Sequence, residues 1–470
     1  MAGDKVRRGF LYYLMMLILF AVAIFFILAV IMVFNPGMNL LGLKYFSQVR
    51  EYRVDEVTAD GQNAEDIDLS KATDIVVDGN LINFEIMRDQ SIEKTTIRIE
   101  NYQTGFAKAD QSTQFSYNIE YSVQENSRAL LSINVTNAEG WIYFNNNCYV
   151  KILLPKDEVI NATNSLSVST DAGSIILGGG QKLLTEEDTY YNFSDVTLHT
   201  QTGSILIGKY LDCNFSHLSV TNENGSFRSS KDITLADEAT LNISGENGSF
   251  EFANISGGKG AVVNYNLTGG SFSATDVDCN VNVKTKKSTM DIQNFHGYMQ
   301  ANDLVNKFDG ANITIDKASG LVSLPFANNS NVTIGDATKA KIFIISDNSQ
   351  LNIDKLAAGS WLETKQGAIN VSLANTEGEI NLVSESANIN IDGNLAMQNQ
   401  IVAKSITGSI TLNYSPQSSF TVSFYNSQGK ERKDVQAQDY QEKLTNPLFV
   451  NGGGTQNSLS TDGAITLRRL

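Results

Sequence analysis

Three histidines, His199, His217 and His296, are the only imidazole side chains that the 470-residue sequence offers for acid–base or metal chemistry. None of them stands in the spacing of a zinc site or of a catalytic triad. His199 and His217 lie in or beside strands of neighbouring repeats, and we interpret them as ordinary sheet residues. The histidines therefore predict no catalytic residue.

Pairs of acidic residues are the second candidate for chemistry, because enzymes that cleave polysaccharides work with paired carboxylates. Asp276 with Asp278 is one such pair, and Glu223 with Glu246, one repeat apart, is another. The sequence contains 51 acidic residues, so solvated bends of the chain explain these pairs equally well. We expect no catalytic use of them.

Two short motifs could hold an ion but lack the features that make such sites specific. Asp276-Val-Asp278 and Asp66-Ile-Asp68 could ligate calcium, yet neither lies in a glycine-spaced calcium loop. The run LGGGQ at 177–181 has neither the lysine nor the helix start of a phosphate-binding loop. We expect no metal and no cofactor.

Recognition by loops is the remaining possibility, since binding functions gather on insertions carried by a rigid scaffold. The candidates are TEEDTYYN at 185–192, where Tyr190 and Tyr191 could stack on a sugar ring, and the segment 298–310. Sequons for N-glycosylation also occur, among them Asn134, Asn224, Asn247, Asn266, Asn312 and Asn370. In a chain rich in Asn, Ser and Thr, sequons arise from composition alone.

Composition narrows the class of protein. The net charge of −16 argues against binding to nucleic acid, which depends on neutralising phosphates. Cys148, Cys213 and Cys279 are far apart and odd in number, so they predict buried apolar residues rather than a disulfide framework.

An uncharged segment of 25 residues, from Phe10 to Phe34, is long enough to cross the hydrocarbon layer of a membrane. A cleavable signal peptide is the alternative, but its apolar core is shorter and ends in small residues. Lys5, Arg7 and Arg8 precede the segment, and the positive-inside rule keeps that end in the cytoplasm. We predict a cytoplasmic tail over 1–9, a signal anchor over 10–34, a linker over 35–44 and an extracellular remainder.

Residues 45–160 are predicted to form a β-rich region next to the membrane, either an antiparallel domain or a mixed-strand entry to the repeat that follows. DIVVDGNLINFEI contains Asp78-Gly79, a pair that favours a tight hairpin, and 141–155 is expected to form a second hairpin. The runs 114–123 and 129–135 alternate with the period of half-buried strands.

A repeat follows over 161–470, and VTNENGSFRS at 220–229 and ISGENGSFEF at 243–252 show it most clearly. A residue at each bend is followed two positions later by an apolar residue, without a polar exception. The bends are Gly173, Gly203, Gly225, Gly248, Gly270, Ser288, Gly320, Ser349, Gly367, Ala387, Gly408 and Gly463. We expect glycine there because it adopts positive φ without penalty.

Spacings of mostly 18–23 residues, with strand–bend–strand units, predict a parallel β-solenoid of roughly twelve rungs. Phe227, Phe250 and Phe272 should stack as one internal ladder, about 4.8 Å from rung to rung. Longer intervals imply either an insertion or a rung that the pattern does not reveal. The charged stretch 426–444, within a larger insertion at 426–456, is predicted to be an exposed loop.

The repeat resembles the bacterial "putative adhesin" family, whose members carry T-x-x-G-x-I units. VKILLP at 150–155, LSVSTDAGSIIL at 166–177, LHTQTGSILIG and a last unit LSTDGAITL carry the resemblance, which covers about 155–470. Ser288, Ser349 and Ala387 depart from the glycine of the motif. The resemblance implies surface display and carries over no catalytic residue.

We therefore expect a non-enzymatic surface protein of the cell membrane, either an adhesin-like binding module or an envelope scaffold. Its expected partners are the membrane and a cell-surface glycan or protein, and not nucleic acid. The alternatives are an anchored polysaccharide-modifying β-helix enzyme and an envelope-stress sensor. The sequence does not identify the ligand.

Overall fold

The structure is a computed structural model of the whole chain. It describes residues 2–470 except 36–37, 41, 58–64, 124–127, 156–159, 161–162, 179–190, 209–210, 213, 302–308, 394–398, 438–447 and 452–453. The chain divides into two compact units. Unit 1 comprises residues 1–158 and 168–174, and unit 2 comprises 159–167 and 175–470.

Unit 1 begins with one long apolar helix, α1, over Ala2–Phe34. Its stretch Tyr12–Phe34 has a mean hydropathy of 3.4 and is only 6% buried, so its length and composition suit a membrane span or a signal sequence. Helical hydrogen bonding ends at Asn35, directly before Pro36, as expected because proline disfavours helical backbone in the preceding residue.

Strands make up the rest of unit 1. They are β1 (Asn39–Leu40), β2 (Leu43–Val54), β3 (Glu56–Val57), β4 (Glu65–Asp66), β5 (Thr73–Gly79), β6 (Asn83–Arg88), β7 (Thr96–Lys108), β8 (Ser116–Val123), β9 (Ala129–Thr136), β10 (Ile142–Leu154) and β11 (Ser165–Ala172), whose first three residues fall in unit 2. Burial alternates along β5, β6 and β9, so each of these strands turns one side to the core.

The strands of unit 1 pair in a mixed way, so the purely antiparallel arrangement expected for 45–160 is wrong and the mixed-strand alternative holds. β2, β7 and β10 are antiparallel neighbours, and so are β8 and β9. In contrast, β6 pairs in parallel with β10, and β5 in parallel with β9. The expected β8 and β9 runs are confirmed, and unit 1 already contains the parallel pairing that dominates unit 2.

Both predicted hairpins are wrong. Neither Asp78 nor Gly79 has positive φ, and the parallel partners of β5 and β6 show that the pair ends a strand rather than closing a type I′ turn. The segment 141–155 contains a single strand, β10, because its whole length finds partners on β7. In both segments, pairing with strands distant in the sequence overrides the local preference for a turn.

Unit 2 consists of strands. They are β12 (Ile175–Leu177), β13 (Tyr191–Asn192), β14 (Asp195–Thr202), β15 (Ser204–Ile207), β16 (Leu211–Asp212), β17 (Asn214–Asn222), β18 (Ser226–Ser229), β19 (Ile233–Gly245), β20 (Ser249–Gly257), β21 (Val262–Thr268), β22 (Ser271–Asp278), β23 (Asn280–Lys286), β24 (Thr289–Phe295), β25 (Tyr298–Gln300), β26 (Asn312–Ala318), β27 (Leu321–Pro325), β28 (Asn331–Asp336), β29 (Lys341–Leu356), β30 (Trp361–Leu373), β31 (Gly378–Ser384), β32 (Asn388–Asp392), β33 (Asn399–Ser405), β34 (Ile410–Tyr414), β35 (Phe420–Tyr425), β36 (Gln436–Ala437), β37 (Leu448–Asn451), β38 (Thr455–Ser460) and β39 (Ile465–Arg469).

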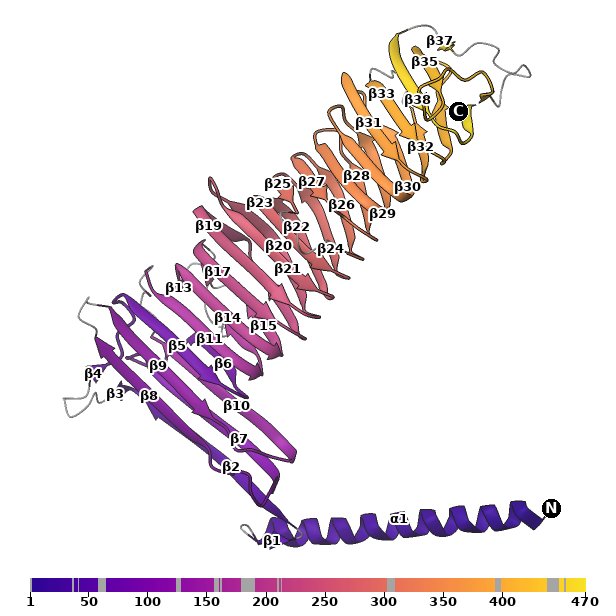
Figure 1. Cartoon of the computed structure of the whole chain (residues 1–470). Coiled ribbons are helices and arrows are strands. Elements are labelled where there is room, and N and C mark those ends of the chain that lie inside the picture. Colours follow the sequence, from indigo (N-terminus) through magenta and orange to yellow (C-terminus); the bar gives the residue numbers. More distant parts are fainter. Residues whose placement is uncertain are drawn as a thin grey trace. The chain divides into compact units, whose positions relative to one another are not determined.

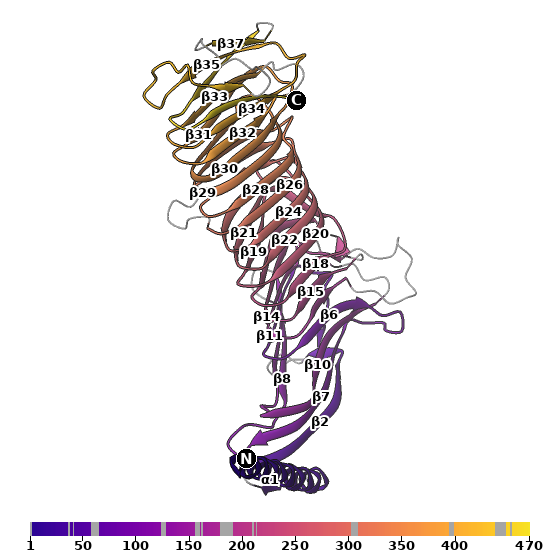
Figure 2. The same cartoon turned by 90° about the vertical axis from the view of Figure 1, so that its right-hand side faces the viewer.

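These strands form successive coils, and apart from the antiparallel pair β35–β37 they pair in parallel from one coil to the next (Figures 1 and 2). One row runs through β14, β17, β19, β21 and β23, and another through β15, β18, β20, β22 and β24. Unit 2 is therefore all-β with a solenoid-like arrangement, as the repeat predicted in outline.

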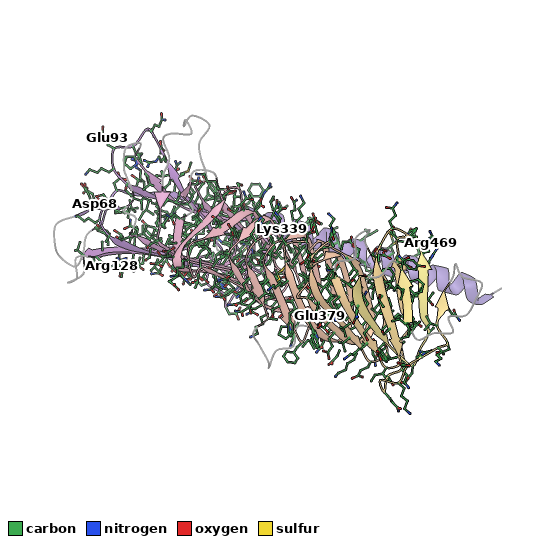
Figure 3. The ribbon with its side chains drawn as sticks, turned by 90° about the horizontal axis from the view of Figure 1, so that it is seen from above. Asp68, Glu93, Arg128, Lys339, Glu379 and Arg469 are labelled. Atoms are coloured by element: carbon green, nitrogen blue, oxygen red, sulfur yellow. The ribbon has the colours of Figure 1, made fainter. Side chains whose placement is uncertain are left out.

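The core of unit 2 lies inside the coils, and the predicted phenylalanine ladder is part of it. Phe227, Phe250 and Phe272 are partners in register on successive strands and are nearly inaccessible to solvent. The rings of Phe227 and Phe250 stack with centroids 6.1 Å apart. Charged side chains such as Lys339 and Glu379 point outward instead (Figure 3). The apolar-in, polar-out alternation sets the register of the coils.

Glycine occupies most bends because neighbouring backbones lie close together, whereas positive φ was the predicted reason. Of the bend glycines, only Gly173, Gly270 and Gly367 have positive φ among the described residues. At Gly225 an added Cβ would lie 1.8 Å from the carbonyl oxygen of Gly203 in the preceding coil. Close approach of one backbone to the next therefore excludes a side chain there.

The row of bends contains two members that the sequence pattern missed. Ala311 and Ser330 are two further bends of this row, between Ser288 and Ser349. The intervals from Ala311 to Ser330 and from Ser330 to Ser349 are 19 residues each. Gly320 belongs to a different bend, which follows Gly297 in the preceding coil. The long intervals near 320 thus reflect unrecognised rungs.

The described part of the insertion at 426–456 is structured rather than the predicted exposed loop. Val435 is buried, and β36 pairs in parallel with the last strand, β39. β35 pairs in parallel with β38, and β37 pairs antiparallel with β35. The described part of the insertion therefore covers the final coil.

Candidate functional site

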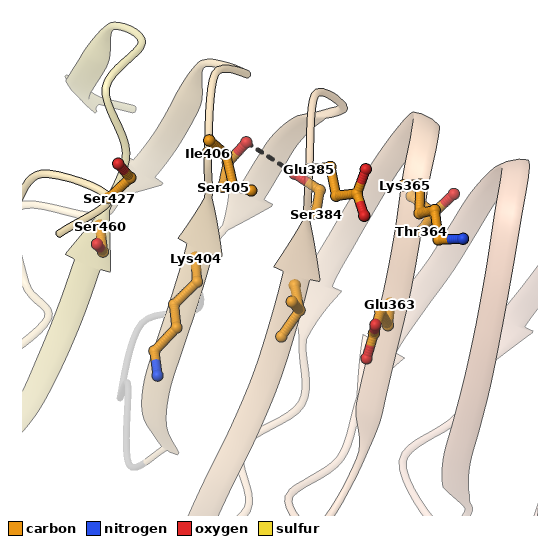
Figure 4. Close-up of a pocket in the computed structure, with 11 residues that line it drawn as sticks. Glu363, Thr364, Lys365, Ser384, Glu385, Lys404, Ser405, Ile406, Ser427 and Ser460 are labelled. Atoms are coloured by element: carbon orange, nitrogen blue, oxygen red, sulfur yellow. Dashed lines mark hydrogen bonds between the residues drawn. The ribbon is translucent and has the colours of Figure 1, made fainter.

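A cleft of about 260 Å³ lies on the surface of unit 2, near the start of one strand and the C-terminal ends of three others. The strands are β30, β31, β33 and β38, which pair in parallel in this order. Its lining residues are Glu363, Thr364, Lys365, Val383, Ser384, Glu385, Lys404, Ser405, Ile406, Ser427 and Ser460 (Figure 4). The lining combines acids, lysines and hydroxyls around two apolar side chains.

Buried hydroxyls form the inner wall of the cleft. Thr364, Ser384 and Ser405 occupy equivalent positions just before the bends, and all three are buried. The hydroxyls of Ser384 and Ser405 lie 2.8 Å apart, and Ser405 Oγ accepts a hydrogen bond of 2.9 Å from the Gly408 amide. These hydroxyls satisfy the backbone at the bends, so they fix the shape of the cleft.

Charged groups stand at the rim of the cleft. Lys365 pairs with Asp347 at 2.7 Å, and this hydrogen-bonded carboxylate raises the pKa of the lysine. Within the described part of the chain, Glu385 and Lys404 form no ion pair, and both are exposed. They remain available to a charged or strongly polar ligand.

An aromatic pair continues the surface beyond Glu363. Phe343 and Trp361 are partners in register on β29 and β30, and each remains 37% exposed. The indole Nε1 of Trp361 donates to Glu363 Oε2 at 3.1 Å, which ties the ring to the rim of the cleft. Exposed aromatic faces beside oriented polar groups are the usual composition of a binding surface.

His199 and His217 lie in strands, as the sequence predicted, and His296 directly follows β24. His217 Nδ1 lies 2.7 Å from Thr240 Oγ1 in the next coil, and His296 Nδ1 lies 2.7 Å from Ser319 Oγ. His199 stands in register beside Thr221. Each imidazole therefore neighbours a hydroxyl-bearing residue of the adjacent strand.

The acidic pairs of the sequence do not converge on a site. Asp276 stands in register between Asn254 and Asn294, and Asp278 is exposed two residues further along the same strand. Glu246 is exposed as well, and the Asn247 amide bonds the backbone oxygen of Glu223 rather than its carboxylate.

The proposed ion ligands have other partners. Asp66 Oδ1 pairs with Lys94 Nζ at 2.8 Å, and Asp68 accepts hydrogen bonds from Ser70. No group of three or more His, Cys, Asp or Glu side chains with metal-site geometry occurs among the described residues.

The described thiols are buried, as predicted. Burial raises the pKa of Cys148 and of Cys279 to about 12, so both thiols stay protonated and unreactive. Cys213 lies outside the described residues.

The predicted recognition loops fall largely outside the described residues, including 185–190 with Tyr190, and 302–308. The backbone of Tyr191 lies in β13, which pairs with β16. The sequon residues lie on the surface, and Asn247 Nδ2 donates to Asn224 Oδ1 of the neighbouring coil at 3.1 Å. Asn134, Asn266 and Asn312 are exposed, whereas Asn370 is half-buried in an asparagine ladder with Asn352.

Comparison with known proteins does not place the chain in a family. No family model and no curated protein matches the sequence. Among solved structures the chain is similar to "a putative cell adhesion protein from Clostridium sporogenes ATCC 15579". The identity is 8%, the match covers 90% of this chain and 100% of that chain, and the TM-score is 0.15. The resemblance to the adhesin family therefore stays a prediction.

The sequence contained an indication of the aromatic surface beside the cleft, and this indication is independent of the repeat pattern. In SWLETK the apolar period turns Leu362 inward, so Trp361 must point outward. A tryptophan on the solvent side of a strand is a candidate contact for a ligand. The polar part of the cleft had no such signal, because its residues come from separate coils that are adjacent only in the folded chain.

Proposed function

We propose that this protein is a membrane-anchored surface protein that acts as a non-enzymatic, adhesin-like recognition module. In this proposal α1 is an uncleaved signal anchor, and a β-solenoid of roughly twelve rungs presents a binding surface outside the cell. The cleft beside Trp361 is the binding site, and its ligand is a cell-surface glycan.

The composition of α1 supports the anchor. Its stretch Tyr12–Phe34 is apolar, long enough for a bilayer and almost uncovered by protein. Exposing such a surface to water would be costly, since each buried CH₂ gains about 0.8 kcal/mol. A lipid environment removes that cost.

The glycan proposal rests on one observation: two exposed aromatic residues lie next to a polar cleft. Phe343 and Trp361 offer flat apolar faces, which suit the C–H faces of a sugar ring. Glu385, Lys404 and Ser427 line the adjoining cleft and suit its hydroxyls. The strands that line most of the site, β30, β31 and β33, are paired on both sides, so the site is preorganised.

A glycan array with the full-length protein in detergent micelles tests the proposal. We expect binding to a subset of cell-wall or host glycans and at least a tenfold loss of affinity in Trp361→Ala, equivalent to about 1.4 kcal/mol. Val76→Ala is the matched control, because Val76 is an exposed apolar residue with the same accessibility, 37%, but lies in unit 1. It should bind as the unmodified chain does.

Three results would contradict the proposal. Equal binding by Trp361→Ala would remove the cleft as the site, and no binding to any glycan would remove the ligand class. Cleavage of a bound glycan, detected as new chain ends by mass spectrometry, would show an enzyme instead of a recognition module.

A further inference from the structure

One edge of unit 1 exposes large apolar side chains in a cluster. Trp141, Ile142 and Phe144 are 51%, 36% and 61% exposed, and they occupy four consecutive positions with Tyr143. Single exposed apolar residues are ordinary, but a contiguous cluster that includes a tryptophan and a phenylalanine indicates an interaction surface. We call these three residues the aromatic edge.

The chain holds the aromatic edge in place. Tyr143 packs against a small separate core of Phe46, Ala107 and Ala138, and its hydroxyl donates to the Ala138 carbonyl at 2.8 Å. The Trp141 amide donates to the Phe106 carbonyl at 2.7 Å.

Phe144 is displaced from the ladder by a β-bulge. The register between β10 and β7 shifts between Tyr143 and Asn145, which leaves Phe144 unpaired and turned outward. Its ring contacts Phe106 edge-on, with centroids 5.3 Å apart. The aromatic edge is therefore a fixed feature of the fold.

Connectivity places this edge beside the end of α1. The helix ends at Phe34, and β1 starts at Asn39. β1 pairs with the start of β2, where Tyr45 is in register with Phe106, and Phe106 is in register with Ile142. Only short, hydrogen-bonded segments separate the aromatic edge from the predicted membrane span.

Two residues of the aromatic edge, Ile142 and Phe144, form an apolar cleft with the helix. A volume of about 430 Å³ is lined by Phe25, Phe26, Ala29, Val30, Val33 and Phe34 of α1 together with Phe106, Ile142 and Phe144. Every lining residue is apolar, so the cleft suits hydrocarbon better than a polar ligand.

We propose that the aromatic edge inserts into the outer interface of the lipid bilayer and forms a second membrane contact besides α1. Tryptophan and other aromatic residues favour this interface, where rings meet both headgroups and acyl chains. Lys108, exposed two residues after Phe106, lies near enough in sequence to face lipid phosphates. This inference rests on the anchoring role of α1 in the proposed function.

The two tryptophans of the chain allow a direct test. Trp361→Phe leaves Trp141 as the only tryptophan, and Trp141→Phe leaves Trp361 as a matched control in unit 2. Each full-length variant is reconstituted into phosphatidylcholine vesicles with lipids that carry bromine just below the headgroup. We expect these lipids to quench Trp141 emission about twofold and to leave Trp361 emission unchanged.

Flotation of the same vesicles in a density gradient separates this inference from the anchor. Floating protein with unquenched Trp141 contradicts the aromatic edge and leaves the anchor intact. A blue-shifted but unquenched Trp141 contradicts it too, because the ring is then covered by α1 or by a second protein copy. Protein that fails to float contradicts the anchor, and the inference with it.

Discussion

Phe250 and Glu251 are neighbours in the chain with opposite environments. Phe250 is inaccessible to solvent between Phe227 and Phe272, whereas the Glu251 side chain is 57% exposed and lies 3.6 Å from Arg228. The period of two along a strand therefore decides whether a residue contributes to stability or to the surface. The same rule turns Leu362 inward and Trp361 outward.

We expect Phe250→Ala to lower the free energy of unfolding of the coils around it by about 3–5 kcal/mol, because it leaves a cavity in the ladder. Glu251→Gln is the matched control, and it should change stability by no more than about 0.5 kcal/mol because exposed ion pairs contribute little. Urea titration followed by far-ultraviolet circular dichroism measures both. Equal midpoints for the two variants would show that this strand is assigned to the wrong face.

At the scale of one coil, the sequence located most of the bends correctly but gave an incomplete physical reason for them. Asn222 is buried, its Oδ1 accepts from the Gly225 amide at 2.6 Å, and its Nδ2 donates to the Gly203 carbonyl at 3.2 Å. Thr364, Ser384 and Ser405 occupy the corresponding position in later coils. The bend thus needs a polar residue inside and little side chain at the corner.

Substituting Gly225 tests this account of the bend. We expect Gly225→Ala to destabilise the protein by about 1–3 kcal/mol, because its Cβ would overlap the Gly203 carbonyl oxygen and separate two coils. The Ser226 amide, which donates to the same oxygen at 3.0 Å, should exchange with deuterium faster.

Ala387 offers the matched control in the same row of bends. It carries a buried Cβ in the native chain, so Ala387→Gly should separate no coils and should cost about 1–2 kcal/mol, through backbone entropy and the loss of one buried methyl group. Unchanged exchange at Ser226 in Gly225→Ala would argue that the coils have room for a side chain at this bend.

The sequence could predict the phenylalanine ladder because apolar residues that alternate along a strand mark the side chains that point inward. It could not separate Gly320 from the row of bends that contains Gly225. Gly320 lies at a different bend of the coil, but it too is followed two positions later by an apolar residue. It also placed hairpins at 78–79 and 141–155, where pairing with distant strands overrides the local turn signal. The polar cleft depends on the stacking of separate coils, and no local pattern reveals that.

At the scale of unit 2, the last strands of the sequence do not form the end of the stack. β38 lies between β33 and β35, and β39 lies between β34 and β36. The segments 420–425, 436–437 and 448–451 therefore cover the final coil, and we call them the cap. Arg432 reinforces it, because Nη1 donates to the carbonyls of Thr461 and Gly463 at 2.5 Å each. The cap shields edges that could otherwise recruit further strands.

Because β38 lies between β33 and β35, Leu459 connects the cap to the rest of unit 2. Leu459 is inaccessible to solvent and stands in register between Ala403 and Phe424. We expect Leu459→Asp to release the cap, because an unpaired carboxylate cannot stay buried there. Deuterium exchange should accelerate at the Arg432 amide, which donates to Phe424, and light scattering should detect oligomers formed through the freed edge.

Ser458→Asp is the control for this prediction, since Ser458 is the half-buried neighbour on the outer side of the same strand. It should leave both exchange and mass unchanged. Stability in stacked repeats is close to a sum of nearest-neighbour terms, so distant strands such as β21 and β23 should keep their protection in Leu459→Asp. Uniform acceleration throughout unit 2 would instead mean that the stack unfolds as one cooperative body, with the cap as part of it.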